Sequence, residues 1–268
     1  MQEIERLKDE ILKSYPRLTR ESSFRFACAP GISCFNACCG DVNIFLTPYD
    51  IARLRSELGV SSREFLSRYA ESPVDEDFRY PVVLLKMNED DRRSCPFVGD
   101  DGCQVYEARP GACRMYPLGM ASPKGDGRSP SEDFYFIFDE GDCRGFDEER
   151  SQTIAEWLSD QGLDEYNRMA RYFKELTLHE FFQEGRSLSP EKSEMFFLAC
   201  YDLDGFREFL FGSTFFDRLA VDEERRERIA EDDVELLRFG HDWLRFALFG
   251  EETLEIKRSA LESRTFRR

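Results

Sequence analysis

Hydrophobic side chains recur every three or four residues near the start of the chain and through its last part, which is the spacing of amphipathic helices. This spacing predicts a short helix over residues 3–15. After residue 147 it predicts helices that break near Gly162 and near Gly212, followed by a long amphipathic run that begins at Asp222. The C-terminal part of the chain is therefore expected to be mainly α-helical.

Two further helices are predicted from the polar residues that would cap them. The segment 47–50, Thr-Pro-Tyr-Asp, offers a threonine cap, a proline in the first turn and a carboxylate that completes a capping box. This helix should end at Gly59, because glycine tolerates the left-handed conformation that terminates helices. Ser61, with Glu64 three residues later, predicts a second helix that runs to about Tyr69.

Short apolar runs rich in β-branched and aromatic residues predict strands between these helices. The predicted strands are residues 42–46, 80–87 and 134–138, together with a hairpin whose strands, 97–98 and 104–106, flank a turn at 99–102. The segment 117–130 is rich in glycine and proline and is predicted to be a mobile loop.

Composition narrows the class of protein. The chain has 268 residues, of which 41% are hydrophobic, so it can bury a core in one large domain or two small ones. The formal net charge of −17 argues against a nucleic-acid partner, because phosphate binding needs clustered Lys and Arg. Neither an apolar run that would span a membrane nor an apolar signal core is present. A cytoplasmic protein with no membrane and no nucleic-acid partner is expected.

The nine cysteines are the unusual feature of such a chain, because disulfides are rare in a reducing cytoplasm. Eight of them stand beside Gly, Pro, Asn and Asp in loop-like sequence, where clustered thiols indicate metal ligands. These candidate ligands are Cys28, Cys34, Cys38, Cys39, Cys95, Cys103, Cys113 and Cys143. The ninth, Cys200, lies in an apolar segment and is expected to be a core residue.

These observations predict an α+β fold in two parts. Residues 1–146 would form a small cysteine-rich metal-binding module with short strands, loops and an N-terminal helix. Residues 147–268 would form a mainly helical part that packs with it. The segment 95–146 has few apolar runs, so the metal-free protein is expected to lose order around residues 28–40 and 95–145.

The cysteine spacing does not select one metal. The paired Cys-x2-Cys knuckles of zinc ribbons are absent, and Cys34-x3-Cys38 matches only the first step of the radical S-adenosylmethionine motif, because position 41 is Asp. In an extended segment the adjacent Cys38 and Cys39 would point in opposite directions. Two four-thiolate sites, one polynuclear cluster, or one four-ligand cluster with spare thiols all stay open.

Several arginines stand next to the candidate ligands in the sequence. A nearby guanidinium group lowers a thiol pKa and offsets the charge of a thiolate, although a chain with 37 basic residues places some of them beside cysteines by chance. These arginines are Arg92, Arg93, Arg109, Arg114 and Arg144.

The cysteine pattern resembles the YkgJ-type cysteine cluster family. The resemblance rests on Cys34-x3-Cys38-Cys39, on Cys95-Pro-Phe, and on the block that begins at Cys103 and reads Tyr-x2-Arg-Pro-x2-Cys-Arg-x-Tyr-Pro over residues 106–117. It covers about residues 28–145, and the first spacing is one residue longer than the family's compact Cys-x2-Cys-Cys form. The family implies chelation of zinc or iron, where iron can be bound as an iron–sulfur cluster. It implies no general reaction.

Three classes of function follow from the pattern and the resemblance. The first is a metal-chelating protein whose site is structural or electron-carrying. The second is a cluster-containing protein-modifying enzyme, such as an S-adenosylmethionine-dependent lysine methylase, although the sequence has no dinucleotide-type glycine motif and no phosphate loop. The third is a thiol redox or metal-handling protein. The only histidines, His179 and His241, are expected at a surface or in helix packing, and the sequence identifies no catalytic residue and no protein partner.

Overall fold

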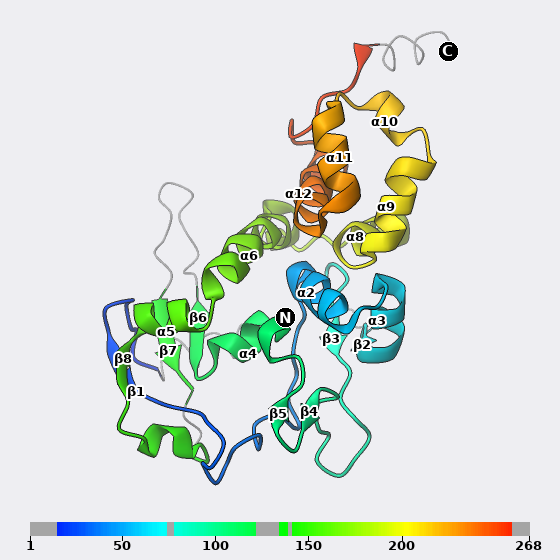
Figure 1. Cartoon of the computed structure of the whole chain (residues 1–268). Helices are drawn as coiled ribbons and strands as arrows, with labels where there is room; N and C mark the ends of the chain where they lie inside the picture. Colours follow the sequence, from blue (N-terminus) through cyan, green and yellow to red (C-terminus); the bar gives the residue numbers. More distant parts are fainter. Residues whose placement is uncertain (1–14, 74–77, 122–133, 139–140, 259–268) are drawn as a thin grey trace. The chain divides into compact units, whose positions relative to one another are not determined.

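The computed structural model describes residues 15–73, 78–121, 134–138 and 141–258 (Figure 1). Helices and small antiparallel strand pairs alternate in the first part of the chain and helices dominate the last part, so the predicted α+β class is confirmed. The helix predicted over 3–15 falls, apart from its last residue, outside this description. Within the described part of the chain, no helix is long and apolar enough to cross a membrane.

The chain packs as two compact units, and each unit takes two separate stretches of sequence. Unit 1 combines Met1–Val42 with Met87–Asn167, and unit 2 combines Asn43–Lys86 with Arg168–Arg268. These are units of packing, so the division of the chain into domains at residue 146 stays a prediction. All eight candidate ligands belong to unit 1.

Unit 1 is built mainly from loops that short strand pairs hold together. Among its described residues the antiparallel pairs are β1 with β8, β4 with β5, and β6 with β7. Its elements are β1 (Ser23–Arg25), β4 (Val98–Gly99), β5 (Gly102–Cys103), α4 (Gly111–Met115), β6 (Leu118–Ala121), β7 (Phe134–Ile137), β8 (Ser151–Thr153) and α5 (Ile154–Asp160), with 3-10 turns at Tyr106–Ala108 and Arg144–Asp147.

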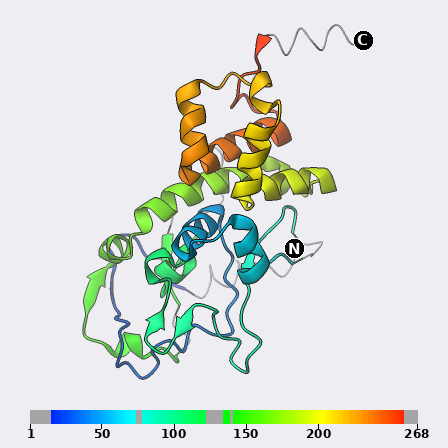
Figure 2. The same cartoon turned by 45° about the vertical axis from the view of Figure 1, so that its right-hand side comes forward.

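Unit 2 is a helical bundle that includes one small strand pair. Helices α2 and α3 lie beside α9 and α12 although they are far apart in sequence (Figures 1 and 2). Its elements are α2 (Pro48–Leu58), α3 (Ser62–Tyr69), β2 (Ala70–Glu71), β3 (Leu84–Leu85), α7 (Glu180–Gln183), α8 (Pro190–Cys200), α9 (Leu203–Gly212), α10 (Phe215–Arg218), α11 (Glu223–Glu231), α12 (Asp233–Leu244) and a π-helical turn at Arg245–Phe249. Helix α6 (Leu163–Thr177) begins in unit 1 and ends in unit 2.

The predicted helix ends are confirmed where capping residues carried the prediction. The Thr47 hydroxyl accepts a hydrogen bond from the Asp50 amide at 3.2 Å, and the Asp50 carboxylate accepts one from the Thr47 amide at 2.8 Å. Gly59 ends α2 with φ at 64°, and Ser61 caps α3. The long run from Asp222 is two helices instead of one, because Asp232 leaves the helical conformation and caps α12 with its side chain.

The strands follow the prediction less closely. Strand β7 and the β4–β5 hairpin are confirmed, but the hairpin ladder pairs Val98 with Cys103, so only two residues form its turn. The run 80–87 shortens to β3 because its partner β2 offers two residues, and residues 42–46 contribute only a single bridge from Phe45. The loop predicted over residues 117–130 was wrong for Leu118–Ala121, which form β6 and pair with β7, and residues 122–130 lie outside the described part of the chain.

Strand β6 was not predicted from the sequence because it contains Gly119, and glycine is typical of loops. A Cβ on Gly119 would lie 2.3 Å from the Phe136 ring, so the strand needs glycine to let that ring approach. A glycine in this position has the same appearance in the sequence as a loop glycine. The packing that requires it becomes visible only when β7 is placed beside it.

Both histidines have packing roles in unit 2, as expected. His179 accepts a hydrogen bond from the Phe181 amide at 3.1 Å, lies 3.2 Å from the Glu251 carboxylate and stacks on the Phe249 ring. His241 on α12 is only 2% exposed, and neither of its ring nitrogens has a hydrogen-bond partner among the residues that the structure describes. Its burial lowers its pKa to about 3.

Acid should therefore destabilise unit 2 through His241. Its pKa is about 6.5 when exposed in the unfolded chain and about 3 in the fold, so the unfolded chain binds the proton first. The stabilisation is complete above pH ~6.5 and is lost as the pH falls toward 3, by up to about 1.4 kcal/mol per pH unit. Denaturant unfolding at several pH values should show a shallower acid slope in His241→Phe, and an unchanged slope would contradict this assignment.

Candidate metal centre

The first cysteine loop is shaped by consecutive tight turns. Backbone hydrogen bonds join Ala37 to Cys34 at 2.9 Å and Cys39 to Asn36 at 3.1 Å. Asn36 has a positive φ of 63°, a conformation that asparagine adopts more readily than most residues. The turns bring Cys34, Cys38 and Cys39 close together without any regular element.

A short antiparallel contact brings the second cysteine segment to this loop. The Cys95 amide donates to the Cys39 carbonyl at 2.8 Å, and Gly40 forms a bridge with Ser94. A Cβ on Gly40 would lie 2.8 Å from the Arg92 carbonyl oxygen, so the two backbones approach each other only because this residue is glycine. Cys39 and Cys95 are neighbours for this reason, although 55 residues separate them in the sequence.

The β4–β5 hairpin places Cys103 near Cys95. The Val98 amide donates to the Cys95 carbonyl at 3.1 Å, and Val98 lies opposite Cys103 in the ladder. The hairpin also lies against the first loop, because the Asn36 side chain donates to the Gly99 carbonyl at 3.4 Å. Cys95 precedes the first strand of the hairpin, and Cys103 lies in the second strand.

Cys113 lies on the short helix α4, which two buried arginines hold in place. Arg114 donates to three backbone carbonyls, those of Arg109 at 3.1 Å, Gln161 at 2.7 Å and Glu107 at 2.5 Å. Arg109 donates to the Tyr106 carbonyl at 2.5 Å and to the Gln161 side chain at 2.5 Å. Each arginine is only 7% exposed. These contacts explain why both arginines of the Arg-Pro-x2-Cys-Arg block matter for the site.

Cys143 follows strand β7 and closes on the first loop. The Arg144 amide donates to the Cys34 sulfur at 3.2 Å, and the Ala27 amide donates to the Gly145 carbonyl at 3.0 Å. A Cβ on Gly145 would lie 2.6 Å from the Ala27 carbonyl oxygen, so glycine is again required for the close approach. Cys28 and Cys143, which are separated by 114 residues in the sequence, thereby become neighbours.

The thiols shift one another's ionisation, which shows how they are grouped. Burial raises the pKa of Cys28 to about 11, with further contributions from Cys38, Cys143 and Cys34. The pKa of Cys39 is raised, first by its hydrogen bond with Cys38, then by burial and by the neighbouring Cys38, Cys95 and Cys113.

Three of the remaining thiols show the same physical causes. The hydrogen bond from Cys39 lowers the pKa of Cys38, so this pair holds one thiol that ionises readily. Burial raises the pKa of Cys95 and of Cys103, and Arg109 partly offsets the effect on Cys103. Metal binding requires thiolates, so it must displace protons from most of these sulfurs.

Tyr116 is the site residue to which the sequence assigned no role. Its pKa is raised by burial and by a hydrogen bond to Cys143, with smaller contributions from Cys38 and Cys34. The phenol therefore stays protonated and donates to the sulfur. The Tyr-Pro pair that follows Cys113-Arg114 in the sequence could have indicated Tyr116. Its role can be inferred only when the fold places Cys143, which follows β7, next to its hydroxyl.

The chemistry of this donor set suits a thiophilic metal, because soft thiolates select zinc and iron–sulfur clusters. Among the residues the structure describes, no three His, Cys, Asp or Glu side chains are arranged so that they could hold a metal ion. The thiols are thus neighbours without forming a closed coordination shell. Cys200, in contrast, is completely buried in unit 2, as expected for a core residue.

Most of the arginines beside the cysteines are engaged elsewhere. Arg92 donates to the Asn36 carbonyl at 3.3 Å, Arg93 pairs with Asp41 at 3.1 Å, and Arg144 lies 3.7 Å from Asp147. Arg109 also acts on a thiol, because its charge lowers the pKa of Cys103 and partly offsets the effect of burial. Their main contribution is therefore to fix the cysteine loops in position.

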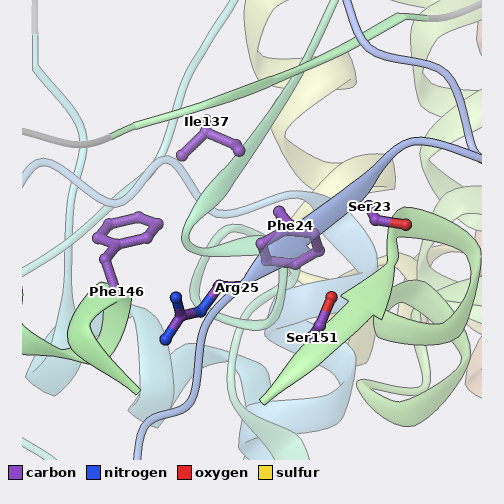
Figure 3. A pocket seen from close by; sticks show the side chains of 6 residues that line it. All are labelled: Ser23, Phe24, Arg25, Ile137, Phe146 and Ser151. Carbon is purple, nitrogen blue, oxygen red and sulfur yellow. The ribbon is translucent and has the colours of Figure 1, made fainter. Parts of the chain in front are cut away.

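A separate cavity of about 440 Å³ lies over the β1–β8 ladder of unit 1. Figure 3 shows the Phe146 ring and the Arg25 guanidinium on one side and the Phe24 ring between Ile137 and Ser151. Ser23 completes the set of six lining residues. None of the six is a cysteine, a histidine, an aspartate or a glutamate. Arg25 is the only charged group among them, and its Nε donates to the Glu148 carbonyl at 3.3 Å. Among these lining residues, Ser23 and Ser151 each contribute a hydroxyl group.

The fold and the clustered thiols define a cysteine-rich, metal-chelating class of domain. Residues 27–144 match the model of the CxxCxxCC family, whose description is "Putative zinc- or iron-chelating domain". This match confirms the resemblance to the YkgJ-type cysteine cluster family. No curated protein and no solved structure matched the chain.

Proposed function

We propose that this protein chelates zinc or iron through the thiolates of the eight cysteines in unit 1, and that the site is structural or electron-carrying. The observation that carries the proposal is the convergence of eight thiols, from five separate loops and short elements, within a segment that matches a zinc- or iron-chelating family. Convergence of this kind serves no packing purpose, since these thiols are exposed or half-buried. A cytoplasmic location would keep them reduced.

The alternative of a protein-modifying enzyme has less support. The family description names chelation alone, and the lining of the cavity in unit 1 includes no cysteine, histidine or carboxylate. Chelation is therefore the function that the site supports best.

The absorption spectrum and elemental analysis of anaerobically purified protein test the proposal and identify the metal. Zinc sites have a filled d shell and no visible colour, whereas iron–sulfur clusters are coloured and redox-active. Colourless protein with stoichiometric zinc would exclude a cluster. Brown protein with iron and sulfide would exclude zinc. Protein with neither metal would contradict the proposed function.

Single substitutions should identify the ligands. Cys39→Ser and Cys113→Ser are each expected to reduce the bound metal, because each removes a thiolate from the cluster of neighbouring sulfurs. Cys200→Ala is the matched control, since Cys200 is fully buried in unit 2 and alanine keeps the site apolar. Metal content is measured by elemental analysis of the purified variants. Wild-type metal content in Cys39→Ser and in Cys113→Ser would refute the ligand assignment.

A further inference from the structure

We propose that the cavity over the β1–β8 ladder binds a small carboxylic acid with an aromatic or aliphatic body. The carboxylate would lie on the Arg25 guanidinium and on the hydroxyls of Ser23 and Ser151. The apolar body would lie against Phe146 and Ile137 (Figure 3). All of these residues belong to unit 1, and none is a candidate metal ligand. The site therefore goes beyond the chelating function and does not depend on it.

The register of the β1–β8 ladder gathers the polar groups of the cavity on one side. Arg25 lies opposite Ser151, and residues directly opposite each other in an antiparallel ladder point to the same side. Ser23 and Arg25 are two residues apart in a strand, so they share this side as well. Phe24, between them, is buried against the Trp157 ring. The exposed side of the ladder thus presents one guanidinium and two hydroxyls together.

These polar groups have unused hydrogen-bonding capacity. The Arg25 Nε donates to the Glu148 carbonyl at 3.3 Å, which orients the side chain and leaves its two terminal amino groups available. Among the described residues, no carboxylate pairs with this guanidinium and neither serine hydroxyl has a hydrogen-bond partner. A guanidinium binds a planar carboxylate through two parallel hydrogen bonds, and a hydroxyl can donate to the same oxygens. The arrangement therefore fits a carboxylate.

The apolar walls of the cavity are held in place by the core of unit 1. The centroid of the Phe146 ring lies 5.2 Å from that of Phe26, which is only 1% exposed. Ile137 pairs with Leu118 in the β6–β7 ladder. Phe146 and Ile137 are themselves half-buried. The cavity of about 440 Å³ lies in the range of roughly 300–1,000 Å³ that is typical of small-molecule sites.

The charge of the lining favours a monoanion with an apolar body over other ligands. Arg25 is the only charged group of the lining. A phosphate dianion would leave one negative charge uncompensated in a chain whose net charge is already −17. A neutral apolar molecule would cover the guanidinium and the hydroxyls without pairing them, which is costly. An apolar body against Phe146 would also keep water from the ion pair and so strengthen it.

Isothermal titration calorimetry of the full chain, as purified, with naphthylacetate tests the proposal. Naphthylacetamide is the neutral control ligand, because it has the same apolar body and nearly the same shape. The carboxylate is expected to bind about tenfold more tightly than the amide, because its hydrogen bonds are charge-assisted. Arg25→Gln should weaken the binding of naphthylacetate by about tenfold and leave the binding of naphthylacetamide nearly unchanged.

Arg150→Gln is the matched control variant. Arg150 stands directly before β8, but its guanidinium pairs with Asp160 at 2.5 Å, so this substitution should leave the affinity for naphthylacetate unchanged. Metal content of Arg25→Gln should equal that of the unaltered chain, because Arg25 contacts no candidate ligand among the described residues. A loss of naphthylacetate binding with full metal content would thus be specific to the cavity.

The comparison of the two ligands on the unaltered chain needs no variant. Equal affinity for naphthylacetate and naphthylacetamide would overturn the recognition of a carboxylate. Absence of naphthylacetate binding, or unchanged affinity in Arg25→Gln, would overturn the site itself. Tighter binding of naphthyl phosphate than of naphthylacetate would overturn the assignment to a monoanion. None of these results would affect the chelating function, which is tested by the metal content.

Discussion

Removal of the metal with a chelator is expected to unfold much of unit 1 while unit 2 stays folded. Apparent binding free energies of structural zinc are about 10–16 kcal/mol, and whole domains are stable by only about 5–15 kcal/mol. Unit 1 depends on strand pairs of two to four residues and on loops, so its described part has little other structure to hold residues 28–40 together with 95–121 and 141–145. The metal-bound thiolates would supply most of the free energy that keeps these segments ordered.

Hydrogen exchange of the full chain, with and without metal, measures this effect for each unit separately. Backbone amides around Cys39, Cys95 and Cys103 should lose protection when the metal is removed. Amides of α8, α9 and α12 serve as the internal control, because Phe196, Phe206 and Leu236 in these helices are completely buried. Return of protection on adding metal back would show that the loss is reversible. Full protection of unit 1 in the metal-free chain would show that the metal does not stabilise its fold.

Arg114→Met is expected to lower the free energy of unfolding by about 3–5 kcal/mol, because it removes the donor of three buried hydrogen bonds. The guanidinium donates to three backbone carbonyls and lies 4.6 Å from the centre of the Tyr166 ring. Methionine fills the space but leaves these carbonyls without their donor, and each unsatisfied buried group costs roughly 1–3 kcal/mol. Arg114→Lys should recover little, because one ammonium group cannot reproduce the fork of donors.

Arg144→Met is the matched control, since Arg144 also follows a candidate ligand in the sequence. Its side chain is 60% exposed and lies 3.7 Å from Asp147, so its loss should change stability by no more than about 0.5 kcal/mol. Its backbone amide, which contacts Cys34, is kept. Denaturant unfolding of the metal-bound variants measures both effects. Equal stability of the two variants would show that Arg114 does not hold α4 in place.

Features that depend on neighbouring residues in the sequence were the ones that could be predicted. Thr47, Gly59 and Ser61 act within one turn of their helices, so their roles follow from local backbone chemistry. Strand β8 was not predicted, because it pairs with β1, which is far from it in the sequence. In this ladder Gln152 lies opposite Phe24, and its side chain donates to the Phe26 carbonyl. No local sequence pattern indicates such a pairing. Asp232 interrupts an apolar period that otherwise continues, which is why one helix was predicted where two exist.

The same distinction applies to the candidate site. The cysteines and the arginines of the motif were visible as residue types, but their grouping depends on close backbone approaches at Gly40 and Gly145. Such approaches join segments that are far apart in sequence. The partners of Arg114 are backbone carbonyls rather than thiols, so its role could not be inferred from which residues stand next to it.

Each unit of the chain combines two separate stretches of sequence. This affects whether the segment that matches the family could fold in another protein. The matched segment 27–144 contains α2 and α3, whose buried Ile51, Leu54 and Phe65 belong to unit 2. Helices α9 and α12, which pack against α3 and α2, lie outside that segment. Transfer of residues 27–144 to another chain would expose these side chains to water, at about 1.5–3 kcal/mol for each large one. The chelating segment can therefore move between proteins only together with a helical partner that covers α2 and α3.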